Sequence, residues 1–304
     1  MSRRERIRKM LLVEPGTPAG LAQRDPAWKG GDEFGQLSEK KLKSTAREIL
    51  ETGVEELSDA QELLWASDTY ALLVVFQALD AAGKDSTIEH VMSGVNPQGC
   101  QVFSFKQPSA EELDHDYLWR TSRCLPERGR IGVFNRSYYE EVLVVRVHQG
   151  ILAAEKLPPP LIDEDIWKRR FKEINTFERY LAHNGVAIVK FYLHVSKEEQ
   201  RRRFLARLDQ PEKNWKFSLG DAKEREHWDD YMDAYEDMLR HTSTEEAPWY
   251  VVPADHKWFT RMAVADIVVS ILEKLKPEFP TITEEKRREL EAARKALEKE
   301  EAKG

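Results

Sequence analysis

The chain is poor in cysteine and has no long apolar run. Only Cys100 and Cys124 occur in its 304 residues, which excludes a disulfide framework and a zinc site built from cysteines. No apolar stretch approaches the roughly 20 residues that a helix needs to span a bilayer, so we expect no membrane partner. The basic N-terminal residues are not followed by the apolar core of a secretory signal, and a cytoplasmic location is therefore expected.

Positive charge is not in excess either. The formal net charge is −7, which argues against nucleic acid as a partner, and the eight histidines lack the spacing of a metal site. Cations nevertheless concentrate in two segments, Arg120, Arg123, Arg128, Arg130 and Arg136 in the first and Arg201, Arg202, Arg203, Arg207, Lys213 and Lys216 in the second. This pattern suits a small or narrow polyanion bound at a defined place. The alternative is a set of solvated helix faces, which we favour for Arg201 and Arg202.

Residues 71–88 read ALLVVFQALDAAGKDSTI, an apolar run followed by a Gly-Lys turn and a Ser-Thr pair. A buried strand that leads through such a turn into a helix directs backbone N–H groups and one ammonium toward the same spot, as a phosphate requires. We call residues 78–84 the Gly-Lys loop. It departs from the usual phosphate-loop pattern, because Ala78 replaces the first glycine and Asp85 follows Lys84. The alternative is a simple strand–turn–helix corner.

An acidic residue lies inside this loop. The carboxylate of Asp80 would repel a bound phosphate unless a cation lies between the two groups. Carboxylates beside phosphates commonly hold Mg²⁺. We therefore expect Mg²⁺ as the cofactor, with Mn²⁺ as a possible substitute.

Apolar strand segments and helical segments alternate along the chain. We expect strands at about 70–77, 101–105, 130–134, 186–195 and 249–252, and helices at about 38–65, 84–93, 110–123, 138–150, 163–184, 197–208, 222–241 and 257–275. This alternation predicts an α/β fold in which helices cover both faces of one parallel sheet. We expect an irregular segment over 1–35, a single domain over 36–276 and a charged helix over 277–304. That last helix is either solvated or docked on another subunit of a homo-oligomer, a dimer or a tetramer.

Polar residues follow four of the predicted strands. They are the Asp80, Gly83 and Lys84 group, then Lys106, then Asn135 and Arg136, and last the basic segment 197–218. In an open parallel sheet, ligands gather at the carboxyl ends of the strands. Phosphoryl transfer requires that the moving group be positioned and its charge neutralised. Two lysines and facing arginines at one edge meet that need, and the segment 197–218 is typical of a cationic lid.

The chain resembles the family-2 polyphosphate kinases. The resemblance covers about residues 35–276 and is carried in order by LDAAGKDSTI, GVNPQGC, FKQPS, ELDHDYLWR, LPERGRIGVFNRSYYEEVLVVRVH, RRRFLARLDQPEKNWKFS, HWDDYMDAYEDML and APWYVVPADHKWF. Asn135 is followed by Arg-Ser-Tyr-Tyr-Glu, as in class III, where other classes carry Asp-Arg-Ser-Trp-Tyr-Asn.

The resemblance implies a P-loop kinase-like, thymidylate-kinase-like three-layer sandwich with a helical lid at about 197–240. It also implies reversible transfer of a terminal phosphoryl group from inorganic polyphosphate to AMP and ADP, giving ADP and ATP. Asp80 would hold Mg²⁺, while Lys106, Arg120 and Arg136 would contact the transferred group. The implied phosphate-binding and nucleotide-binding residues are Ala81, Ala82, Gly83, Lys84, Asp85, Ser86, Thr87 and Asn135 in the core and Arg207, Lys213 and Lys216 in the lid.

One departure from the other classes concerns the metal. Asn135 stands where those classes have a metal-binding aspartate, and Glu140 stands where they have a neutral asparagine. We hypothesise that Glu140 restores the missing negative charge as a metal ligand. Two other interpretations stay open, a nucleoside monophosphate kinase that uses ATP as donor and a module that binds nucleotides without chemistry.

Overall fold

The computed structural model describes residues 2–31, 34 and 38–301; of Glu39, Lys213, Lys216, Leu219, Glu300 and Glu301 it describes the backbone alone. Five strands form one parallel sheet in the order β2-β3-β1-β4-β5. The strands are β1 (Ala71–Gln77), β2 (Cys100–Ser104), β3 (Ile131–Asn135), β4 (Val186–His194) and β5 (Trp249–Pro253). Each overlaps a predicted strand and differs from it by one residue at either end at most, so the strand predictions are confirmed.

The central strand β1 shows why apolar runs in the sequence predict the strands. All seven of its residues are buried, because parallel strands covered on both faces consist of apolar residues without alternation. Leu72, Val74 and Phe76 pack into one hydrophobic cluster, and Leu73 and Val75 pack into another on the opposite face. The sheet is therefore the middle layer of three.

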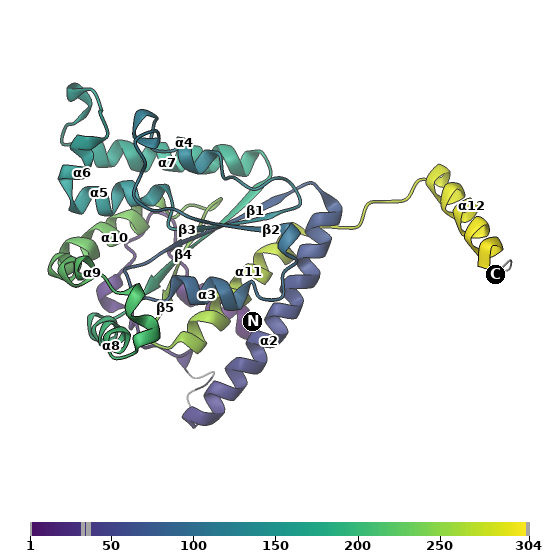
Figure 1. The fold of residues 1–304 in the computed structure, drawn as a ribbon, viewed down its shortest axis with the longest axis horizontal. Coiled ribbons are helices and arrows are strands. Elements are labelled where there is room, and N and C mark those ends of the chain that lie inside the picture. The colour runs from purple at the N-terminus through teal and green to yellow at the C-terminus, as the bar shows by residue number, and fades with distance from the viewer. Residues whose placement is uncertain (1, 32–33, 35–37, 302–304) are drawn as a thin grey trace.

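The two outer layers are helical (Figure 1). The first cluster joins the sheet to α1 (Arg3–Leu11), α2 (Glu39–Ser67), α3 (Lys84–Val91) and α11 (Lys257–Leu275). The second cluster joins it to η5 (Tyr138–Val142), α7 (Ile166–His183) and α10 (Trp228–Thr242). The helix α8 (Lys197–Leu208) follows β4, with the bounds that the sequence predicts.

The N-terminal segment is not irregular throughout. Residues 3–11 form α1, which begins with a capping box between Ser2 and Glu5. Its buried residues Ile7 and Leu11 belong to the first cluster, and Arg4 is paired with Asp266 of α11 at 3.2 Å. The prediction for 1–35 is therefore wrong at α1, because docking onto α11 stabilises a helix that its weak local pattern does not announce. Residues 1, 32, 33 and 35 of this segment lie outside the described part.

Three predicted helices are broken into shorter pieces. Residues 110–123 contain only η4 (Glu112–Asp114) and α4 (Trp119–Ser122), and residues 138–150 contain η5, α5 (Val144–Val147) and the start of α6 (Gln149–Ala154). Non-helical backbone at Leu143 and His148 separates the second set, so propensity alone overestimates their continuity. The segment 222–241 is divided among the end of α9 (Leu219–Glu224), η8 (Arg225–His227) and most of α10. The remaining short helices are η1 (Leu21–Gln23), η3 (Pro97–Gly99), η6 (Pro159–Leu161) and η7 (Pro211–Lys216).

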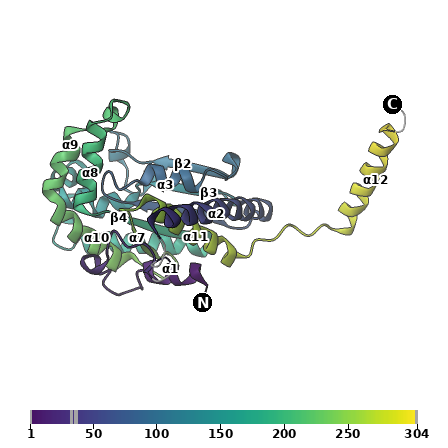
Figure 2. The ribbon, with the colours of Figure 1, turned by 90° about the horizontal axis from the view of Figure 1, so that it is seen from below.

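The C-terminal helix α12 (Glu284–Glu301) stands apart from the three layers (Figure 2). Its apolar residues Leu290 and Leu297 are exposed. Within the described residues, no helix has both the length and the apolar character needed to cross a bilayer.

Candidate functional site

The Gly-Lys loop connects the end of β1 to the start of α3. Gly83 is the residue that precedes the helix and has a φ of +105°, and Ala81 has a φ of +62°. Such backbone suits glycine, and an alanine adopts it only when its surroundings hold it there. The turn brings the first N–H groups of α3 to the carboxyl edge of the sheet, where an anion would meet the positive end of the helix.

The side chain of Lys84 folds back under this loop. It is buried, and its Nζ donates to the carbonyl oxygen of Ala78 at 2.7 Å. Burial and the charge of Arg136 together lower the pKa of Lys84 from 10.5 to about 8, against the opposing effect of Asp80. The described residues offer this ammonium no carboxylate at hydrogen-bond distance, so a phosphate oxygen could bind there.

Arg136 connects the end of β3 to the loop. Its Nη2 donates to the carboxylate of Asp80 at 2.7 Å, and its Nη1 to that of Glu140 at 3.3 Å. Burial alone would lower the pKa of Arg136, but the charges of Glu140 and Asp80 raise it, so the guanidinium stays a cation. Glu140 also accepts from the Gln77 amide at 2.8 Å when that amide is oriented to satisfy both of its ends. Its predicted role as a metal ligand stays a prediction.

Asn135 and Lys106 are placed by different partners. The amide of Asn135 donates to Asp85 at 2.7 Å and so joins the end of β3 to the first turn of α3. Lys106 follows β2, and its carbonyl oxygen accepts from Arg120 at 2.8 Å. The Arg120 guanidinium lies over the ring of Phe105, 5.4 Å from its centroid. Arg120 thus supports the backbone that carries Lys106.

Most of the predicted site residues line one cavity of about 1130 Å³, which we call the first cavity. Those residues are Asp80, Ala81, Gly83, Lys84, Asp85, Ser86, Lys106, Asn135, Arg136 and Arg207. The structure therefore brings together the residues that follow β1, β2 and β3 and one from α8. The convergence expected from the strand ends is present in the fold.

Of the six other predicted residues, four do not belong to this lining. Ala82 and Thr87 are buried, and Thr87 lies in the first turn of α3. Arg120 and Glu140 line a neighbouring cavity instead. The side chains of Lys213 and Lys216 lie outside the described part of the chain, so their predicted lid role stays a prediction.

The neighbouring cavity, called the second cavity, has a volume of about 610 Å³. Lys106 and Arg136 line both cavities and so stand where the two meet. The apolar part of its wall comes from Leu113, Leu118, Val144, Val145, Ile151 and Leu157. A space of this size, in which apolar side chains lie among charged ones, can enclose a small molecule.

A buried charge cluster also lines the second cavity. Arg170 donates to Glu141 at 2.7 Å and is also paired with Glu155. Burial and the neighbouring Glu155 raise the pKa of Glu141 from 4.5 to about 8, although Arg170 opposes the shift. The Glu141 carboxyl therefore keeps its proton to a higher pH than an exposed glutamate does.

Sequence reasoning missed several residues of the site. Asp221 and Trp215 line the first cavity, and Glu141, Glu155 and Arg170 line the second. The helix periodicity of residues 197–208 offered one usable signal. Gln200, Arg203 and Phe204 are the buried residues of α8, and they recur at the spacing of one helix face.

The carboxylates of the first cavity fit a hard divalent cation. Burial raises the pKa of Asp221, and the nearby charge of Asp80 raises it further, which is the repulsion that a bound cation would relieve. Among the described residues, no three or more His, Cys, Asp or Glu side chains gather as a metal centre. Mg²⁺ beside phosphates needs only one or two carboxylates, with substrate oxygens and water as its other ligands.

Comparison with known proteins yields a family match. The family model described as Polyphosphate kinase 2 (PPK2) matches residues 40–280. The match includes the Gly-Lys loop and every predicted site residue.

Named relatives are similar over most of the chain. An ADP-polyphosphate phosphotransferase of Rhodopseudomonas palustris is 59% identical over 251 residues, which cover 82% of this chain and 87% of the relative. An AMP/ADP-polyphosphate phosphotransferase of Meiothermus ruber is 47% identical over 276 residues, which cover 90% and 95%.

A solved structure agrees with the fold. The crystal structure of polyphosphate kinase 2 from Arthrobacter aurescens has a TM-score of 0.82 and 38% identity, and the match covers 94% of this chain and 96% of the other. The predicted α/β fold of the P-loop kinase type is confirmed.

Proposed function

Because this chain belongs to the polyphosphate kinase 2 family, we propose that it transfers the terminal phosphoryl group of inorganic polyphosphate to ADP and AMP, reversibly, giving ATP and ADP. One observation carries the proposal: Asp80, Lys84, Lys106 and Arg136 line the same cavity. These residues follow three different strands, and all of them face the space where a phosphate would lie beside the helix α3.

The two cavities suggest where each of the two substrates binds. Polyphosphate is a chain of anions, and the first cavity offers the cations Lys84, Lys106 and Arg207 together with the backbone of the Gly-Lys loop. The nucleoside of AMP or ADP carries an apolar base, which suits the second cavity. The phosphates of the nucleotide would then reach Lys106 and Arg136, where the two cavities meet.

The proposed chemistry needs position and charge more than covalent catalysis. Lys84 and the N–H groups of the loop would bind the oxygens of the terminal phosphoryl group. Arg136, kept a cation by Asp80 and Glu140, would neutralise the charge that develops between donor and acceptor. Lys106 would bind the acceptor phosphate and hold it in line for attack.

We propose Mg²⁺ as the cofactor, with Mn²⁺ as a substitute. Asp80 would hold it, and when bound it would supply positive charge between carboxylate and phosphate oxygens. Asp221 adds a second carboxylate on the same cavity. Glu140 is the weaker candidate, since it lines the second cavity and not the first.

The remaining proposals concern organisation. We propose that residues 197–240 act as a lid over a domain of residues 36–276, with Arg207 and the lysines at 213 and 216 closing on phosphate oxygens. We also propose a homo-oligomer, a dimer or a tetramer, that acts in the cytoplasm and binds neither nucleic acid nor membranes.

The choice of donor tests the proposal. The purified enzyme is incubated with AMP or ADP and Mg²⁺, with either long-chain polyphosphate or GTP as donor, and ATP is measured over time. We expect ATP with polyphosphate and a rate lower by at least about 10²-fold with GTP. A Lys84→Met protein purified in parallel measures contaminating kinases. ADP is measured in the same samples, and formation of ADP from AMP that depends on GTP and not on polyphosphate would replace the proposal with an ordinary nucleoside monophosphate kinase.

A further inference from the structure

Three consecutive carbonyl groups of the Gly-Lys loop are held by one helix. Gln200 of α8 donates to the carbonyl oxygen of Asp80 at 3.0 Å. Arg203, one turn further along, donates through Nη1 to those of Ala81 at 2.9 Å and Ala82 at 2.7 Å. The loop carbonyls on this side are therefore fixed by side chains and not by water.

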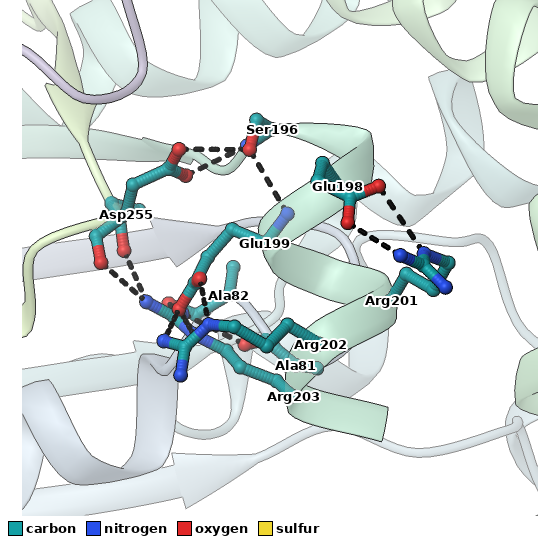
Figure 3. Close-up of polar contacts among 10 residues, drawn as sticks. Ala81, Ala82, Ser196, Glu198, Glu199, Arg201, Arg202, Arg203 and Asp255 are labelled. Atoms are coloured by element: carbon teal, nitrogen blue, oxygen red, sulfur yellow. Dashed lines mark hydrogen bonds and ion pairs between the residues drawn. The ribbon is translucent and has the colours of Figure 1, made fainter. Parts of the chain in front are cut away.

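The remaining N–H groups of the Arg203 guanidinium also donate to protein oxygens (Figure 3). Its Nη2 donates to the carbonyl oxygens of Ala254 at 2.6 Å and Asp255 at 3.2 Å, in the turn after β5. Its Nε donates to Glu199 at 2.7 Å. A guanidinium has five N–H donors, and these contacts use all five. Arg203 therefore keeps no donor for a phosphate, although it borders the first cavity.

The neighbouring arginines behave differently. The side chains of Arg201 and Arg202 are 56% and 71% exposed, against 8% for Arg203. Arg201 is paired with Glu198 and Arg202 with Glu199, both within their own helix (Figure 3). Only Arg203 of the three reaches the loop, so the chain itself supplies a matched comparison.

The base of α8 is anchored independently of Arg203. Ser196, the residue that caps α8, donates through its backbone N and its Oγ to the carboxylate of Asp255, at 2.9 Å and 2.8 Å. The helix and the turn after β5 thus form a fixed support. Arg203 connects this support to the Gly-Lys loop.

We propose that Arg203 is a positioning residue for phosphoryl transfer, which sets the direction of the peptide groups in the Gly-Lys loop. In a peptide unit the carbonyl and the next N–H point to opposite sides. Holding the carbonyls of Asp80 and Ala82 toward α8 turns the N–H groups of Ala81 and Gly83 away from it. The same contacts keep Ala81 in its left-handed conformation. This inference deepens the proposed function and rests on it.

The test compares Arg203→Lys with Arg201→Lys. A lysine keeps the charge but cannot reach four carbonyl groups on two segments, so we expect the kcat for ATP formation from ADP and polyphosphate to fall about 10²-fold. The KM for ADP should change less than about threefold, because the second cavity is untouched. Arg201→Lys should match the unaltered enzyme. Rates are normalised to the folded fraction measured by circular dichroism. A kcat for Arg203→Lys within about twofold of that for Arg201→Lys would overturn the proposal.

A second variant covers the case in which Arg203→Lys does not fold. Gln200→Leu removes the donor to the Asp80 carbonyl, together with an acceptor of Arg225, and leaves Arg203 in place. We therefore expect a smaller fall in kcat, about tenfold, with the KM for ADP again unchanged. If kcat is unchanged while the folded fraction falls, the contacts of α8 with the loop serve stability alone and positioning is refuted.

Binding of inorganic tripolyphosphate, measured by calorimetry, separates this inference from the proposed function. We expect Arg203→Lys to weaken it about tenfold and Arg201→Lys to leave it unchanged. If the unaltered enzyme makes no ATP yet shows this difference, the proposed function fails and the positioning role stands. Equal affinities in the two variants would remove the positioning role whatever the activity.

Discussion

The two cavities are built in contrasting ways. The floor of the first cavity is backbone, a tight loop whose carbonyls are held from behind by α8 and by Lys84. The second cavity is walled by side chains, apolar ones mixed with charged ones that include Arg170, Glu141 and Glu155. A rigid backbone presents N–H groups at fixed places, which suits phosphate. Apolar side chains accept a flat base with few directional demands, which suits a nucleoside.

This contrast suggests that nucleotide binding and the proposed phosphoryl transfer can be altered separately. Among the described residues, Phe105, Lys106, Gln107 and Arg136 line both cavities. Changes in the first cavity should therefore affect the chemical step with any acceptor. Changes deep in the second should affect affinity for the nucleotide alone.

The largest expected effect comes from Lys84→Met, which keeps the length of the side chain and removes its charge. We expect kcat/KM for polyphosphate to fall about 10³-fold, because the buried ammonium faces the phosphate site and nothing replaces it. The KM for ADP should change little. Lys274→Met, on the exposed side of α11, is the control and should match the unaltered enzyme in the coupled ATP assay. Comparable activities of the two variants would mean that the Gly-Lys loop does not bind the donor.

A smaller effect is expected from Ile151→Trp, which fills part of the second cavity. The KM for ADP should rise about tenfold while the KM for polyphosphate stays within about twofold, since the added ring occupies space without touching the loop. Leu161→Trp places the same ring at an exposed position outside both cavities and should have no effect. A parallel rise in both KM values would show that the substrates do not divide between the cavities as proposed.

The smallest expected effect is on the pH dependence of stability, through the Glu141 carboxyl in the second cavity. The pKa of Glu141 is about 8 in the folded protein and 4.5 ordinarily, so the folded state binds a proton that the unfolded state has released between these values. The stabilisation is complete below about pH 4.5 and is lost as the pH rises toward 8.

Glu141→Gln should remove this contribution. We expect the melting temperature of the unaltered protein to fall between pH 5 and pH 8 by a few °C more than that of the variant, given about 2–4 °C for each kcal/mol. Glu127→Gln, an exposed change away from both cavities, should keep the full dependence. Equal slopes for all three proteins would mean that Glu141 is ionised throughout.

The sequence predicts the strands more accurately than the segments that follow them. All five strands and the helices 197–208 and 257–275 were readable, because long apolar or amphipathic runs dominate their local preferences. The stretches after β2 and β3 were read as continuous helices and are broken. There the backbone turns to bring Arg120 and Glu140 to the second cavity, and such turns depend on distant partners.

The sequence by itself determined the layered α/β architecture and many of the residues that line the first cavity. The periodicity of apolar residues indicates which of them are buried, and the carboxyl ends of parallel strands lie at one edge of the sheet. Only the tertiary structure decided which carbonyl groups Arg203 binds, that Arg120 supports Lys106, and that the pKa of Glu141 is raised beside Glu155. These outcomes depend on which groups from far along the chain lie within hydrogen-bond distance, and that is a property of packing in space.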